Sequence, residues 1–78
     1  MNLYLLTRPD QVDYDEYDSV VVCAESEEEA KNIHPCENYP VWNNSSWVAS
    51  PDLVECELIG TAKEGSFKGV VLASFNAG

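Results

Sequence analysis

Hydrophobic residues recur at every second position, or in short β-branched runs, along four stretches of the chain, and this pattern predicts four β-strands. Residues 2–7 place Leu3 and Leu5 on one face and Tyr4 and Leu6 on the other. A strand at residues 19–24 follows from the run Ser-Val-Val-Val-Cys-Ala and is expected to pair with the first. Residues 53–59 and 67–75 predict the last two strands, with the turn between them at residues 60–66.

The same alternation assigns faces in the last two predicted strands. In the third strand it turns the apolar residues inward and Glu55 and Glu57 outward. In the fourth strand it places Val70 and Leu72 on one face and Val71 on the other. The inward-facing residues expected in the third strand are Val54, Cys56 and Leu58.

A short helix is predicted between the two pairs of strands. Ser26 and Glu29 form a capping box, in which the Ser26 hydroxyl accepts from the Glu29 amide and the Glu29 carboxylate accepts from the Ser26 amide. Ala30 and Ile33 give the helix a narrow apolar stripe, and Pro35 limits it to about two turns. Because so short a helix is stable only when it is docked, we expect it to lie on the sheet.

These elements predict an α+β fold in a single domain, residues 1–78. The expected architecture is a small antiparallel sheet of about four strands with one short helix on one face, in the order β-β-α-β-β. The pattern does not determine the order of the strands within the sheet. A long irregular stretch from residue 35 to 52 contains three prolines and two tryptophans.

Charge changes this picture of an ordinary small domain. Asp and Glu total 14 against 4 Lys and Arg, which gives a formal net charge of −10. Nine of the acids lie between Asp10 and Glu29, where there is no Lys or Arg. Such a charge repels nucleic acid and anionic membranes and favours basic partners. A run of like charges is also commonly a solvated surface that only confers solubility, so both interpretations stay open.

The acidic stretch is the strongest candidate for a binding surface. Between Asp10 and Asp18 carboxylates alternate with tyrosines, which offers acceptors for lysine and arginine together with rings that stack on guanidinium groups. Carboxylates at suitable spacing can compete with phosphates for a basic groove. The residues predicted to bind a partner here are Asp13, Tyr14, Asp15, Glu16, Tyr17, Asp18, Glu27 and Glu28.

Two tryptophans, Trp42 and Trp47, form a second candidate. Tryptophan is enriched among the residues that dominate binding energy, so an exposed Trp/Tyr loop would define a protein-interaction module in which the acids serve only solubility. In the other interpretation both tryptophans cover the sheet face opposite the helix and complete the core. The sequence leaves the two open.

Catalytic and metal chemistry find little support. His34 is the single histidine, Cys36 follows two residues later, and no orienting group is specially placed, so no enzyme and no cofactor are expected. His34 is expected at the surface, at the end of the helix. Cys23, His34, Cys36 and Cys56 offer the donors of a structural zinc site, which stays a third alternative, although their spacing lacks the usual ligand pairs. An odd number of cysteines indicates a reducing cytoplasm.

Three segments of the chain are Tyr14-Asp15-x-Tyr17-Asp18-Ser19-x-Val21-Val22-x-Ala24-x-Ser26-x-x-Glu29-Ala30, then Ile33-His34-Pro35, and Ser74-Phe75-Asn76-Ala77-Gly78. Together they resemble small phage and prophage proteins. Size, acidity and the β-β-α-β-β outline also resemble anti-CRISPR proteins that block type I effector complexes. No functional residue is carried over, because those inhibitors share no catalytic motif, and residues 36–50 contribute nothing to the resemblance.

The resemblance implies a non-enzymatic inhibitor acting in the host cytoplasm. Its partner would be the basic surface of a nucleic-acid-binding defence complex such as a type I CRISPR effector, whose DNA or guide binding it would block. No direct contact with nucleic acid or membrane is expected, and the protein would be a monomer or a weak dimer.

Overall fold

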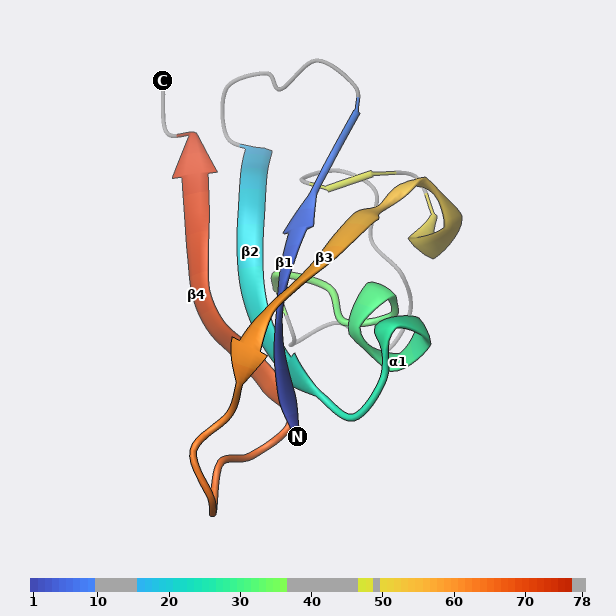
Figure 1. Ribbon diagram of the computed structural model, residues 1–78. Coiled ribbons are helices and arrows are strands. Elements are labelled where there is room, and N and C mark those ends of the chain that lie inside the picture. The colour runs from blue at the N-terminus through green and yellow to red at the C-terminus, as the bar shows by residue number, and fades with distance from the viewer. Residues whose placement is uncertain (10–15, 37–46, 49, 77–78) are drawn as a thin grey trace.

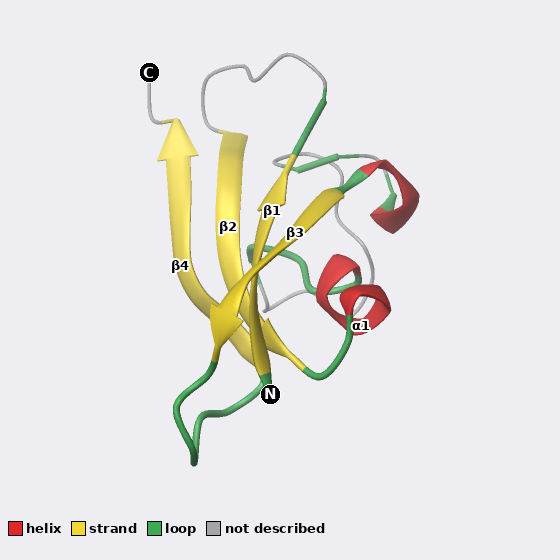
Figure 2. Ribbon diagram, in the orientation of Figure 1, coloured by secondary structure: helices red, strands yellow, loops and turns green. Residues whose placement is uncertain are grey.

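The computed structural model describes residues 1–9, 16–36, 47–48 and 50–76, which form one antiparallel sheet with a short helix (Figures 1 and 2). The strands are β1 (Asn2–Thr7), β2 (Glu16–Ala24), β3 (Glu55–Thr61) and β4 (Gly69–Asn76). The helix α1 spans Glu27–Lys31, and a 3-10 turn, η1, spans Pro51–Leu53. A four-stranded antiparallel sheet with one short helix agrees with the expected fold class, and the five-residue helix is shorter than the predicted two turns.

The strands lie in the order β3-β1-β2-β4. β1 and β2 form the predicted hairpin, with Leu5 opposite Val21. The last two strands do not form a second hairpin, since β3 pairs with β1 and β4 pairs with β2. The expectation of two hairpins is therefore wrong. The central hairpin has two free edges whose backbone groups need partners, and each of the later strands satisfies one of them.

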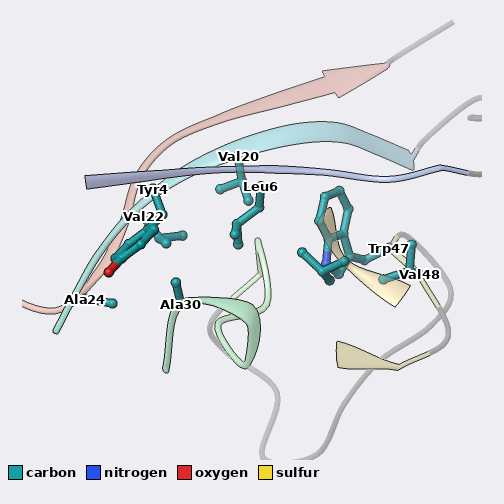
Figure 3. Close-up of a cluster of buried hydrophobic side chains, with 9 residues drawn as sticks. Tyr4, Leu6, Val20, Val22, Ala24, Ala30, Trp47 and Val48 are labelled. Carbon is teal, nitrogen blue, oxygen red and sulfur yellow. The ribbon is translucent and has the colours of Figure 1, made fainter. Parts of the chain in front are cut away.

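One face of the sheet carries the hydrophobic core (Figure 3). Tyr4 and Leu6 of β1, which were predicted to share a face, both point to the core, and Ala30 of α1 packs beneath them with no exposed surface. A small residue at this position lets the helix approach the sheet closely. The buried cluster is completed from β2 and from the segment before β3, by Val20, Val22, Ala24, Trp47, Val48 and Val54.

The N-terminus of α1 is capped nearly as the sequence predicts. The Ser26 hydroxyl accepts from the Glu29 amide at 3.1 Å. The Glu29 carboxylate accepts from the amide of Glu25, at 3.2 Å, one residue before the expected donor. At the other end the Asn32 side chain donates to the Glu28 carbonyl at 2.8 Å. Local hydrogen bonds thus hold both ends of a helix that is too short to be stable alone.

The predicted faces of the outer strands are only partly correct. Val54 is buried and Cys56 packs against the core, but Leu58 is 60% exposed. In β4 the alternation is broken by a bulge, because Val70 pairs with Val22 and Leu72 with Val21. The extra residue puts Val70 on the core face and leaves Leu72 on the other, which corrects the expectation that they share a face.

Candidate functional site

The helix and the 3-10 turn border an open groove that is rich in carboxylates. Glu27 and Glu28 come from the first turn of α1, where the helix dipole favours negative charge, and Asp52 comes from η1. All three side chains are exposed. The described residues that line it are Glu27, Glu28, Lys31, Asn32, Pro51 and Asp52.

Asp52 was not among the predicted binding residues, whereas Glu27 and Glu28 were. Asp52 lies far from the helix in the sequence, and only the return of the chain toward β3 brings η1 beside α1. No local pattern around Asp52 signals that it would face a helix. The groove therefore combines two predicted residues with one that the fold alone supplies.

Arg8 is buried and ion-paired inside the protein. Its side chain is 4% exposed, and its guanidinium lies 3.8 Å from the Glu16 carboxylate. The guanidinium also donates to the Tyr17 carbonyl at 3.0 Å and lies 5.7 Å from the centre of the Trp47 ring. A buried guanidinium needs such partners, because its desolvation is costly when the charge is not compensated.

Glu16 and Tyr17 therefore make contacts within the protein, and the strand that contains them begins earlier than the predicted residue 19; that they bind a partner stays a prediction. They belong to β2, and the Glu16 side chain is only 17% exposed. The Tyr17 ring is half-buried and meets Phe75 edge-on, with 4.8 Å between ring centres. Asp18 is exposed, as expected, and its carboxylate accepts from the Ser19 hydroxyl.

Trp47 is a core residue, so the prediction that it anchors an exposed interaction loop is wrong. It is 1% exposed and packs in the same cluster as Leu6 and Ala30. The alternative interpretation was right about burial but wrong about the face, since Trp47 lies on the same side of the sheet as the helix (Figure 3). The other predicted binding residues, Asp13, Tyr14, Asp15 and Trp42, lie outside the described residues.

The residues of the third alternative, a zinc site, are not arranged for a metal. Cys56 packs against the core beside Leu6, whereas Cys23 pairs with Leu3 and points to the opposite face. His34 is buried, contrary to the expected surface position, and its Nδ1 accepts from the Cys36 amide at 2.9 Å. Across the described parts of the chain no three His, Cys, Asp or Glu side chains form a group that could hold a metal ion.

The Cys56 thiol has a shifted pKa. Burial raises the pKa of this thiol above its ordinary value, and the negative charge of Glu27 raises it further. Lys31 acts in the opposite direction. A raised pKa keeps the thiol protonated near neutral pH, which makes Cys56 a poor nucleophile.

Comparison with known proteins gives no relative: no family model, no curated protein and no solved structure matches the chain. Within the described residues, none of the helices has the length and apolar character needed to cross a membrane.

Proposed function

We propose that this protein is a non-enzymatic inhibitor that binds the basic surface of a nucleic-acid-binding complex through its exposed carboxylates. The observation that carries the proposal is the way the structure distributes charge. Its one arginine is used internally, so the basic groups left for the surface are three lysines.

The buried ion pair leaves the net charge undiminished. Arg8 and Glu16 neutralise one another, so the formal charge of −10 is carried by the thirteen other acids against Lys31, Lys63 and Lys68. Self-repulsion of this size works against a compact small domain. Solubility alone requires a smaller excess of one sign, which favours a role for the charge in binding.

The groove between α1 and η1 brings exposed carboxylates together where a basic partner can reach them. Carboxylates from two elements converge there, and each can accept charge-assisted hydrogen bonds from lysine or arginine. α1 is fixed by its capping hydrogen bonds, so Glu27 and Glu28 are presented on a rigid support. Asp18 adds a carboxylate from β2.

The resemblance to phage proteins and to inhibitors of type I CRISPR effectors suggests which complex is bound. Such an effector holds nucleic acid in basic channels, and a soluble acidic protein in the host cytoplasm could occupy one of them in place of DNA or guide. The mode of action would be occlusion, with no bond made or broken. Trp47 is buried in the core, which weakens the alternative of an exposed Trp/Tyr interaction loop.

The proposal is tested by neutralising the groove and comparing a control with the same change of charge. The groove variant is Glu27→Gln/Glu28→Gln/Asp52→Asn, and the control, Glu55→Gln/Glu57→Gln/Glu64→Gln, removes three exposed carboxylates elsewhere. Tagged protein is used to capture partners from a bacterial lysate, which are identified by mass spectrometry. Affinity for the captured complex, and its binding to DNA, are then measured with each variant.

We expect the captured complex to bind nucleic acid and the protein to compete with it. If each lost contact costs about 0.5 kcal/mol, the groove variant should bind about tenfold more weakly, and the control should change affinity much less. Wild-type affinity should fall steeply between about 0.05 and about 0.5 M NaCl. Salt-independent affinity, or equal losses in the two variants, would count against an acidic binding surface in the groove.

A further inference from the structure

The two edges of the sheet differ in charge. β3, at one edge, carries two exposed glutamates, Glu55 and Glu57. β4, at the other, has eight residues and none is charged. It forms the left border of the sheet in Figure 1. Edge strands present unpaired backbone groups, and proteins commonly guard them with charged side chains. β3 is guarded in this way and β4 is not.

β4 also exposes apolar side chains that a guarded edge would bury or replace. Val71 is 58% exposed, Leu72 68% and Phe75 45%. One bulge lies at Val71, and the register with β2 shifts again at Asp18, between the pairs Ser19–Ser74 and Tyr17–Phe75. One side of β4 is hydrogen-bonded to β2, and no described strand pairs with its other side. Among the described residues it is an uncharged edge with exposed apolar side chains and no strand paired to its outer side.

We infer that this edge pairs with β4 of a second copy of the chain, antiparallel and across a two-fold axis, so that two four-stranded sheets become one continuous sheet. The distribution of charge favours a second copy of the chain as the strand that pairs with β4. Two bodies of net charge −10 can approach only where neither presents carboxylates, and β4 is the edge strand without them. Pairing of β3 with its copy would bring Glu55 and Glu57 against the same residues.

The position of the helix supports the same arrangement. α1 packs over β1, β2 and β3, which places Glu27 and Glu28 toward the β3 side of the sheet. A β4–β4 contact therefore keeps the two acidic grooves apart and leaves both accessible. A partner with two basic sites, or a repeated one, would then be bound more tightly than by one groove alone.

This dimer and the proposed inhibitor surface respond to salt in opposite directions. Binding of a basic partner weakens as salt screens the attraction. Self-association through β4 strengthens, because salt screens the repulsion between two acidic bodies while the strand contact itself carries no charge. Failure of one proposal therefore does not imply failure of the other.

The test uses sedimentation equilibrium of the full chain, up to about 1 mM, in about 0.05 and about 0.5 M NaCl. The disrupting variant is Leu72→Lys, and the matched control is Leu58→Lys on β3, at a leucine of similar exposure. Both lower the net negative charge by one, so a purely electrostatic effect would make both associate more. Circular dichroism checks that each variant keeps its fold.

We expect the wild type and Leu58→Lys to form a discrete dimer that tightens in high salt. Leu72→Lys should remain a monomer, with a dissociation constant raised at least about tenfold, because its lysine meets a like charge across the two-fold axis. A monomeric wild type in both salts would overturn the inference. So would a series of larger oligomers, which would indicate β3-to-β4 contacts, or a monomer whose captured partner is lost in Leu72→Lys, which would indicate a strand from another protein.

Discussion

Alternating or β-branched apolar patterns predict both the central hairpin and the two outer strands, but the two regions lie in different environments. β1 and β2 supply more than half of the buried cluster, whereas β3 and β4 supply none of its fully buried residues. From the outer strands only Cys56, Val70 and Ala73 pack against the core. The difference arises because the covering layer is small: α1 has five residues, and Trp47 and Val48 cover part of the rest. An alternating pattern predicts a strand, but how deeply that strand is buried depends on the helix and loop residues that pack over the sheet.

The largest expected effect is a difference in unfolding free energy between substitutions of a fully buried and a fully exposed aromatic side chain. Replacing Trp47 by alanine removes a fully buried ring and should cost about 3–5 kcal/mol of unfolding free energy, enough to unfold most of so small a domain. Replacing Phe67, which is 91% exposed, by alanine should change the unfolding free energy by less than about 0.5 kcal/mol. Urea denaturation followed by circular dichroism measures both. Comparable losses would mean that the outer region is packed as tightly as the centre.

An intermediate effect is expected at the buried guanidinium. Arg8→Ala removes the contacts of the guanidinium with the Glu16 carboxylate and the Tyr17 carbonyl and should cost about 3 kcal/mol. Lys68→Ala, at an exposed position beside β4, should have an effect close to zero. Because the pair is shielded from solvent, the difference in unfolding free energy between the wild type and Arg8→Ala should be nearly the same in high salt as in low salt. If most of this difference disappears in about 0.5 M NaCl, the pair behaves like a surface ion pair.

The smallest effect concerns two cysteines, one in each region. Cys23 is 1% exposed and should react with iodoacetamide only when the sheet opens. Cys56 is partly exposed, but its raised pKa should make it slower than an ordinary thiol near neutral pH, and Glu27→Gln should speed its reaction. Rates are measured by mass spectrometry of peptides across pH. If Glu27→Gln leaves the Cys56 rate unchanged, the carboxylate does not act on this thiol.

The same pKa shift has a consequence for stability, and its sign follows from proton linkage. The folded protein holds the Cys56 proton more tightly than the unfolded chain, whose thiol has a pKa near 9.0. The stabilising contribution is therefore fully present below pH 9.0 and is lost as the pH rises through the folded value.

The features that the sequence predicted correctly are local. Alternation along β1 predicts that Tyr4 and Leu6 share a face, and the spacing of Ser26 and Glu29 predicts the helix cap. Each depends on residues within a few positions of one another. The helix is shorter than expected because Asn32 takes the cap position and Pro35 soon follows.

The features that it missed depend on contacts between distant segments. Arg8 is read from sequence as a strand end next to a proline, and nothing nearby indicates that it will be buried against Glu16 and Trp47. The bulge at Val71 depends on pairing with β2 and reverses the faces predicted after it. Asp52 joins the acidic groove only because η1 lies beside α1. In the candidate groove, Glu27 and Glu28 were singled out by the sequence and Asp52 was not, and binding of a partner there stays a prediction.

The strand order also has a consequence for the newly synthesised chain. β1 and β2 leave the ribosome first and can pair at once, but the partner of β1 on its other side is synthesised only after the helix and η1. Until then the nascent hairpin has two open edges and an apolar face that only α1 and the segment containing Trp47 and Val48 can begin to cover. Such intermediates are prone to aggregate, so expression of this protein should depend more on chaperones and growth temperature than its small size suggests.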